Sequence, residues 1–306
     1  MTTLVTVATK NRTLVAACLV LGFAAIIGLT DNLVRPLAAE IGLWQFHAMR
    51  SMFALALLGL GAPLLGLNLR PVRPGAVALR SLLLGGAIMI YFASLAFMPV
   101  AGAAAGLFTA PIFTLLIVRF CFGVPIGRFR IAAVIVGFAG VLLVLNPSPG
   151  RTGMIALMPV VAGILYALGN IATRRWCEGE TPEALLMGFF IALGVMGAVG
   201  MVVMAILQPS VPQGPAGFVL RPLVALSPSI LAQILFQAVG ALAGVALLTR
   251  AYQIAEVSRV AIFEYALLPM AAAWSWVLWG QSASAAELAG MVLIVVSGLI
   301  IALRGR

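Results

Sequence analysis

Charged residues are scarce in this chain of 306 residues, where Asp, Glu, Lys and Arg together make up only 8%. A soluble domain carries roughly 25% charged residues, because water must solvate most of its surface. The low charge therefore excludes an ordinary soluble domain. Hydrophobic residues instead reach 63%, and the mean hydropathy is +1.19. This composition predicts an integral membrane protein.

Residues that carry metal, redox or catalytic chemistry are also few. The three cysteines, Cys18, Cys121 and Cys177, are scattered without a metal-binding or disulfide spacing, so we interpret them as structural. The sequence has no P-loop and no nucleophile with a base at a recognisable spacing. An enzyme, an ATP-driven pump, a metal site and a bound cofactor are therefore not expected.

Long apolar runs, by contrast, are abundant. A transmembrane helix needs ~20 apolar residues, because each residue rises about 1.5 Å and lipid cannot hydrogen-bond the backbone. Stretches rich in Pro, Gly and charge separate the runs, and the first run is long enough to span the membrane instead of serving as a signal peptide. We predict an all-α protein with ten transmembrane helices, at residues 13–31, 43–67, 76–98, 100–119, 130–146, 153–173, 184–207, 229–250, 257–279 and 286–303.

Basic residues that flank these helices indicate how the chain is oriented. With a cytoplasmic N-terminus, 14 of the 18 Lys and Arg residues fall on the cytoplasmic side, Arg50 lies within a helix, and only Arg35, Arg151 and Arg221 fall outside. Because basic flanks resist transfer across the membrane, we predict that both termini are cytoplasmic. The net charge of +10 then reflects topology and contact with anionic lipid headgroups, so nucleic acid is not expected as a partner.

Two halves of the chain share landmark residues. A proline followed by a glycine-terminated helix recurs at a spacing of 158 residues, and an asparagine recurs at a spacing of 138. Each half, residues 1–150 and 151–306, holds five predicted helices, and this odd number inverts the second half in the membrane. Inverted repeats are an architecture of secondary transporters, with the solute site near the midplane. The landmark pairs are Pro111 and Pro269, Gly140 and Gly298, and Asn32 and Asn170.

Two long segments resemble a known family. The stretch "PIFTLLIVRFCFGVPIGRFRIAAVIVGFAGVLLVLNP" and the stretch "AEVSRVAIFEYALLPMAAAWSWVLWGQ" are similar to the repeated EamA unit of the drug/metabolite transporter superfamily. The patterns "FEY" at Glu264 and "HAMRS" at Arg50 also resemble this family, and YddG-type amino-acid exporters in particular. The resemblance implies a ten-helix exporter of small metabolites. The chain departs from the family at Val124 and Gln281, where many members carry Glu, so any role of that Glu does not transfer.

One carboxylate, Glu264, lies inside the ninth apolar segment. Residues three and four positions away along the helix are mostly small, which suits a packed helix or a cavity wall better than a lipid-facing surface. Pro269 follows and has no N–H for the carbonyl of Tyr265, which we expect to stay a free acceptor. Glu264 is either a pathway residue or a structural acid paired with Arg259 or a neighbouring tyrosine.

Helical spacing also indicates which other side chains face a solute pathway. The predicted lining is weakly polar and aromatic, without a deep cluster of fixed charge, so it suits neutral or zwitterionic solutes such as an amino acid with an apolar side chain. Gln237 and Asn170 equally fit hydrogen bonds between helices, and the prolines equally fit packing kinks. The predicted lining residues are Asn32, Tyr91, Phe92, Phe108, Thr109, Tyr166, Asn170, Gln237, Glu264, Tyr265 and Trp274, with helix kinks at Pro111 and Pro269.

The only histidine, His47, lies one turn before Arg50 in the second predicted helix. We expect His47 at the outer membrane interface beside Trp44, with a pH-sensing imidazole as the alternative. Arg50 must snorkel or pair, and Asp31 or Glu40 could serve it. Four other acids are expected to be solvated in connecting segments, namely Glu178, Glu180, Glu183 and Glu287.

Together these features predict a multi-pass transporter of a bacterial inner membrane that exports small metabolites, above all amino acids with aromatic or other neutral side chains. The predicted mechanism is alternating access through a central cavity. Facilitated diffusion is preferred to proton exchange, because Glu264 is the only acid placed to carry a proton. Proton-coupled efflux of drugs or lipophilic cations, lipid scrambling and a non-transporting sensor are the alternatives. The expected partners are the solute and membrane lipid, and no oligomer is required.

Overall fold

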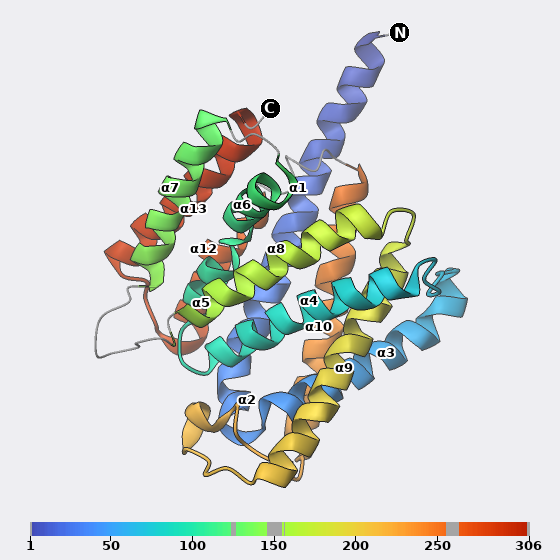
Figure 1. The fold of residues 1–306 in the computed structure, drawn as a ribbon, viewed down its shortest axis with the longest axis vertical. Helices are drawn as coiled ribbons and strands as arrows, with labels where there is room; N and C mark the ends of the chain where they lie inside the picture. Colours follow the sequence, from blue (N-terminus) through green and yellow to red (C-terminus); the bar gives the residue numbers. More distant parts are fainter. Residues whose placement is uncertain (1, 124–126, 146–154, 156, 255–262, 305–306) are drawn as a thin grey trace. The chain divides into compact units, whose positions relative to one another are not determined.

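The computed structural model describes residues 2–123, 127–145, 155, 157–254 and 263–304 (Figure 1). This described part is helical and contains no β-strand, in agreement with the all-α prediction. A short 3-10 helix, η2 (Gly214–Gly217), lies in the long loop after α9. The α-helices are α1 (Thr2–Asn32), α2 (Val34–Glu40), α3 (Leu43–Leu65), α4 (Pro74–Leu95), α5 (Val100–Leu107), α6 (Ala110–Phe122), α7 (Arg128–Leu145), α8 (Met158–Trp176), α9 (Pro182–Leu207), α10 (Pro228–Ile254), α12 (Leu267–Trp279) and α13 (Ala285–Arg304).

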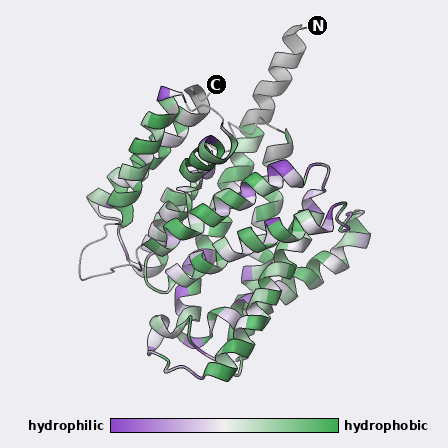
Figure 2. Cartoon of the chain, in the orientation of Figure 1, coloured by the Kyte–Doolittle hydropathy of each residue, from purple (hydrophilic) through white to green (hydrophobic). Residues whose placement is uncertain are grey.

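Six stretches of the described chain are long and apolar enough to cross a membrane, and three shorter helices are also apolar (Figure 2). Together with α8 they match the ten predicted segments, although the start of the ninth lies outside the described residues. The chain is therefore a multi-pass membrane protein. The six long stretches are Leu14–Glu40, Leu43–Leu65, Pro74–Leu95, Val100–Phe122, Pro182–Leu207 and Pro228–Leu248, and the shorter ones are Ile131–Leu145, Leu267–Trp279 and Ala285–Ile300.

Helix ends follow local sequence signals. Gly66, Gly123 and Gly280 follow α3, α6 and α12 with φ of 65°, 68° and 65°, a left-handed conformation that favours glycine because it has no Cβ. Thr181 caps α9, and its Oγ1 accepts a hydrogen bond of 3.2 Å from the Ala184 N–H. Gly123 and Gly280 close the predicted fourth and ninth helices, so the two halves end these helices in the same way.

The predicted fourth and ninth helices are both broken. Phe108 and Thr109 separate α5 from α6 in the fourth helix, and a turn at Tyr265 and Ala266 precedes α12 in the ninth. Each break comes shortly before a proline, which has no N–H to bond the carbonyl one turn earlier. The Leu268 N–H donates a hydrogen bond of 3.1 Å to the carbonyl of Tyr265, so the expectation that this carbonyl stays free is wrong.

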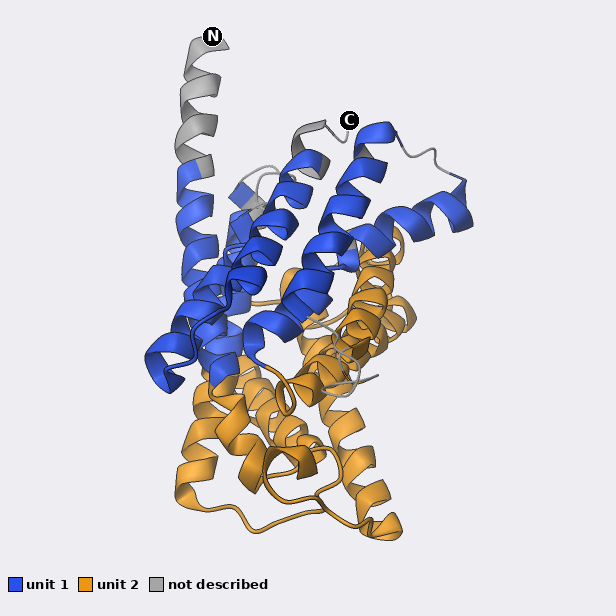
Figure 3. Ribbon diagram, turned by 90° about the vertical axis from the view of Figure 1, so that its left-hand side faces the viewer, with its two compact units in different colours: residues 1–32, 99–153, 240–306 blue, residues 33–98, 154–239 orange. Residues whose placement is uncertain are grey.

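The chain folds as two compact units (Figure 3). Each unit takes segments from both predicted halves, so neither unit coincides with a predicted repeat. The two compact units do not test whether residues 1–150 and 151–306 are repeats of each other, so the repeat stays a prediction. Unit 1 comprises residues 1–32, 99–153 and 240–306, and unit 2 comprises residues 33–98 and 154–239.

Each unit is built from a few closely packed pairs of helices. In unit 1, α7 packs along α13, and α12 packs against α1 and α5, whereas in unit 2, α9 packs against α3 and α4, and α4 also packs along α8. In unit 1, Gly240 and Gly244 of α10 also lie against Thr30 and Ile27 of α1.

Glycines let α7 and α13 approach each other closely. A Cβ added to Gly140 would lie 2.7 Å from the Gly290 carbonyl oxygen, and one added to Gly290 would lie 2.6 Å from the Gly140 oxygen. The buried Ser297 hydroxyl donates a hydrogen bond of 2.7 Å to the Ala133 carbonyl in the same interface. Because the hydrophobic effect does not drive helices together in lipid, close backbone packing and such hydrogen bonds hold this pair.

In unit 2, the long loop of residues 208–227 is held against the start of α3. The Arg221 guanidinium donates hydrogen bonds of 2.8 and 2.9 Å to the carbonyls of Ala38 and Ile41, and one of 3.0 Å to the loop's own backbone. Gln45 exchanges two hydrogen bonds, of 2.8 and 3.0 Å, with the loop backbone. The loop is therefore an ordered element, although the sequence indicates only a long connection.

Candidate functional site

The predicted lining residues are divided between the two units. A single cavity lined by all of them stays a prediction, and the contacts inside each unit show which residues come together. Unit 1 holds Asn32, Phe108, Thr109, Glu264, Tyr265 and Trp274 with both prolines, and unit 2 holds Tyr91, Phe92, Tyr166, Asn170 and Gln237.

In unit 1, two predicted lining residues hold the crossing of α1 and α12. Asn32 is buried, and its Nδ2 donates hydrogen bonds of 2.8 Å to the Gly28 carbonyl and 3.0 Å to the Ala271 carbonyl. The indole Nε1 of Trp274 donates a hydrogen bond of 3.0 Å to the Ala25 carbonyl. Backbone carbonyls thus satisfy the donors of both side chains, so these polar groups fix the helix crossing.

The two helix breaks of unit 1 meet through aromatic residues. The ring centroids of Phe108 and Tyr265 lie 5.4 Å apart, with 53° between the ring planes. Thr109 is fully buried, and its Oγ1 donates a hydrogen bond of 2.6 Å to the Gly106 carbonyl. The Tyr265 ring also lies against Gly298, where an added Cβ would overlap it. The structure therefore brings together three predicted lining residues from both halves of the chain.

Glu264 lies half-buried directly before the break in the ninth helix. Of its two predicted structural partners, Arg259 falls outside the described residues, and pairing with it or with a neighbouring tyrosine stays a prediction. Pro269, three residues beyond the turn, is exposed on α12. The pathway role and the structural role of Glu264 both stay predictions.

A cationic and aromatic cluster in unit 2 joins α3 to α4. The guanidinium carbon of Arg50 lies 4.8 Å from the ring centroid of Phe92 and 5.8 Å from that of Phe46. The imidazole of His47 meets the Phe92 ring edge to face, with 4.9 Å between centroids. The Tyr91 ring packs on Phe92 at 5.5 Å. Sequence reasoning predicts Tyr91 and Phe92 as lining residues, which stays a prediction, and the structure shows which side chains pack against them.

His47 is fully buried, at 0% exposure, and its position near the outer membrane interface stays a prediction. Neither imidazole nitrogen has a hydrogen-bond partner among the described residues. Buried polar side chains are hydrogen-bonded in the large majority of cases, and an exception needs a physical explanation. The spacing of three residues between His47 and Arg50 places both on one face of α3, and this was the sequence signal for the cluster.

The remaining predicted residues lie on α8 and α10 in unit 2. Tyr166 is half-buried, Asn170 is exposed and Gln237 is buried. α8 packs closely on α4, because a Cβ added to Gly169 would lie 2.6 Å from the Cγ of Leu84. The exposed Asn170 thus differs from its first-half counterpart Asn32, which is buried in a helix crossing.

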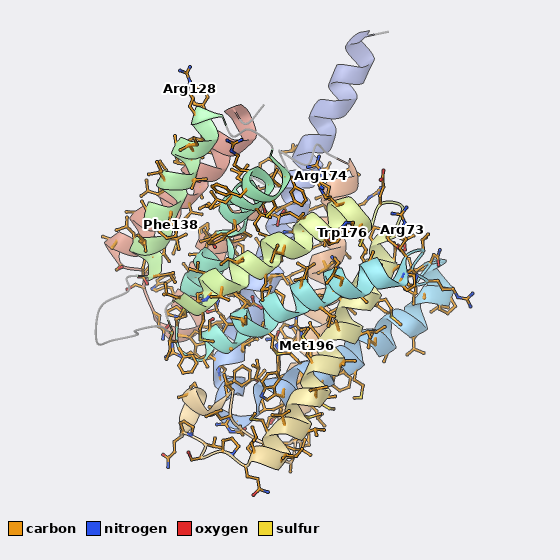
Figure 4. The ribbon with its side chains drawn as sticks, in the orientation of Figure 1. Arg73, Arg128, Phe138, Arg174, Trp176 and Met196 are labelled. Atoms are coloured by element: carbon orange, nitrogen blue, oxygen red, sulfur yellow. The ribbon has the colours of Figure 1, made fainter. Side chains whose placement is uncertain are left out.

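Two acids that we expected to be solvated accept hydrogen bonds from the backbone. Glu180 accepts them from the N–H groups of Val72, at 2.9 Å, and Arg73, at 2.5 Å, just before the start of α4, where Figure 4 labels Arg73. Glu287 accepts a hydrogen bond of 2.6 Å from the Ser284 N–H in a capping box at the start of α13. Both carboxylates therefore have structural roles.

Metal ligands do not gather in the part of the chain that the structure describes, where no group of three or more His, Cys, Asp or Glu could hold an ion. Cys18 and Cys121 are exposed, Cys177 is buried, and all three are free thiols. Burial raises the pKa of the Cys177 thiol, which directly follows α8.

Comparison with known proteins gives the class of function. The chain is 28% identical over 277 residues to a riboflavin transporter of Rhizobium johnstonii, a match that covers 89% of this chain and 83% of that protein. Two uncharacterized transporters of Helicobacter pylori are 25% and 24% identical over 196 residues, or 63% of this chain and 66% of each relative. These relatives support membrane transport.

Other comparisons concern the fold. A solved crystal structure with 19% sequence identity matches this chain with a TM-score of 0.64, over 96% of this chain and 97% of that one. That likeness shows the fold alone. No protein-family model matches the chain. The relatives and the many apolar helices are consistent with a bacterial inner membrane and with a small-molecule solute as the partner.

Proposed function

We propose that the chain is a secondary transporter of the drug/metabolite transporter type, which carries small neutral solutes across a bacterial inner membrane by alternating access. The observation that carries this proposal is the meeting of the two helix breaks, where Phe108 packs on Tyr265 at 5.4 Å. Broken helices at matching positions of inverted repeats form the solute sites of many secondary transporters, because interrupted backbone can orient polar groups of a solute.

The proposed solutes are small, neutral or zwitterionic, and contain an aromatic ring. Aromatic side chains make up much of the predicted lining in both units, and a ring offers them a large apolar face. Riboflavin is one named candidate, because the relative in Rhizobium johnstonii is a riboflavin transporter. The aromatic amino acids are the other, on the resemblance of both halves to amino-acid exporters.

The proposed energetics are those of facilitated diffusion. Proton exchange needs a carboxylate whose protonation and solute binding exclude each other, and Glu264 is the only acid in the predicted lining. Net transport then follows the gradient of the solute. The protein exports a solute that is more concentrated in the cytoplasm.

Efflux from reconstituted liposomes tests the proposal. Separate batches are loaded with riboflavin, tryptophan, phenylalanine or the lipophilic cation tetraphenylphosphonium, and efflux is measured with and without a pH gradient. We expect protein-dependent efflux of riboflavin or an aromatic amino acid that a pH gradient does not change. Efflux of the lipophilic cation alone would favour drug efflux, and movement of a fluorescent lipid without any solute flux would favour a scramblase. Either result would overturn the proposal.

A further inference from the structure

We propose that His47 and Arg50 recognise a planar heteroaromatic ring of the transported solute, one that carries carbonyl or ring-nitrogen acceptors. The inference rests on the proposed function and names the side chains of unit 2 that select the solute.

The imidazole nitrogens of His47 can form hydrogen bonds, but no described residue bonds them. Its side chain is completely buried, and neither Nδ1 nor Nε2 has a hydrogen-bond partner among the residues that the structure describes. A neutral imidazole carries one donor and one acceptor, and leaving them unpaired in a protein interior costs free energy. A solute with complementary groups recovers that free energy when it binds. The imidazole therefore favours a polar ring edge over an apolar one.

Phe92 of α4 marks the position of the solute ring. Its ring centroid lies 4.9 Å from the imidazole centroid of His47 and 4.8 Å from the guanidinium carbon of Arg50. A guanidinium plane is weakly hydrated and stacks well on aromatic faces, so this position suits a ring. The inference requires the Phe92 side chain to rotate away so that a solute ring takes the same position. Phe46, stacked 5.5 Å from Phe92, then forms the aromatic wall beside it.

The side chains of His47 and Arg50 favour some kinds of solute ring over others. A phenyl ring, whether that of Phe92 or of a phenylalanine solute, presents no acceptor to an imidazole N–H. A heteroaromatic ring with a carbonyl or a ring nitrogen at its edge can accept a hydrogen bond from His47 while its face stacks on the Arg50 guanidinium. The isoalloxazine ring of riboflavin has both features. We therefore expect the pair to favour riboflavin over phenylalanine.

Two substitutions at His47 test this role in reconstituted liposomes with riboflavin as the probe. His47→Phe keeps the packing on Phe46 and Phe92 but removes the hydrogen-bonding groups, so we expect the half-saturating riboflavin concentration to rise about tenfold, as the loss of one hydrogen bond predicts. His47→Gln keeps a donor and an acceptor and should restore most of the affinity. Met52→Phe, at a position of α3 that is 50% exposed, is the matched control and should leave transport unchanged.

A second variant and a second readout separate recognition from structure. Arg50→Lys keeps the charge but loses the planar face, so it should also weaken riboflavin transport, while the thermal stability of each variant reports on folding. Equal half-saturation in the wild type and His47→Phe would overturn the inference and leave the proposed function standing. Weakened transport in His47→Phe that tracks lost stability, without rescue by His47→Gln, would show a packing role instead. Amino-acid flux without riboflavin flux in the wild type would also overturn the inference, and no flux of either would overturn the proposed function.

Discussion

The side chain of Asn32 donates a hydrogen bond of 3.0 Å from Nδ2 to the carbonyl oxygen of Ala271, 239 residues further along the chain. The same nitrogen donates to the Gly28 carbonyl at 2.8 Å, so both amide hydrogens are committed to backbone. The last residue of α1 is thereby tied to the helix that follows the second break. Asn32, which we predicted to line the pathway, therefore holds two helices together. Helical spacing alone does not distinguish a lining role from a packing role.

Replacing Asn32 by Leu should lower the free energy of unfolding by about 1 kcal/mol, the usual worth of a hydrogen bond between membrane helices. Asn170→Leu, at the matching but exposed position of the second half, is the control and should change it by less than about 0.5 kcal/mol. Unfolding in mixed micelles, followed by circular dichroism, measures both. Equal losses in the two variants would show that the contact with Ala271 contributes nothing specific.

Substitution of Gly140 by Ala should separate α7 from α13, because the added Cβ would lie 2.7 Å from the Gly290 carbonyl oxygen. We expect a loss of about 1–3 kcal/mol in the free energy of unfolding, the typical cost of overpacking a tight interface. Gly59→Ala in α3 is the control, since nothing lies within 4 Å of its added Cβ and the substitution should be neutral or slightly stabilising. A stable Gly140→Ala variant would contradict the close approach of the two helices.

Arg221→Gln should release the loop of residues 208–227 from the α2–α3 corner. The substitution removes the guanidinium that donates to the carbonyls of Ala38 and Ile41, and a shorter side chain cannot reach both. Hydrogen exchange read by mass spectrometry should then show faster exchange in this loop, with α9 unchanged. Arg35→Gln, at an exposed position of α2, should leave exchange in the loop as it is.

Glu264→Gln distinguishes the two energetic versions of transport. Facilitated diffusion requires no proton transfer, so solute flux should stay the same in the variant, with or without a pH gradient. Glu287→Gln is the control, because it also removes a carboxylate, but from the capping box of α13, away from the predicted lining. Wild-type flux that is driven by a pH gradient and lost in Glu264→Gln would establish proton coupling instead.

Cys177 should react slowly with maleimide, and its rate should keep rising above about pH 8.5, where an ordinary thiol is half ionised. Burial raises the pKa of this thiol, so less thiolate is present at a given pH. A variant with Cys18→Ala and Cys121→Ala isolates the signal, and the unfolded protein provides the reference rate. A rate in the folded protein that levels off at or below pH 8.5 would contradict the shift.

Particular residues show how far sequence reasoning extends. Gly123 and Gly280 mark helix ends correctly, because a left-handed residue after a helix depends on local conformation alone. The complete burial of His47 was not predicted, because burial depends on which helices pack around a residue. The breaks at Phe108 and at Tyr265 were expected only as kinks, since a proline signals a disturbed helix without saying how the chain adjusts.

The sequence by itself determined the membrane class and the positions of the helices, because a segment that spans lipid must be long and apolar, and composition records this directly. Only the tertiary structure decided the partners of the polar side chains, because those partners come from helices distant in sequence. Asn32 is satisfied by the carbonyl of Ala271, whereas His47 is buried against Phe92 with its ring nitrogens unbonded by the described residues. Helical spacing tells which way a side chain points, and only packing shows what it meets.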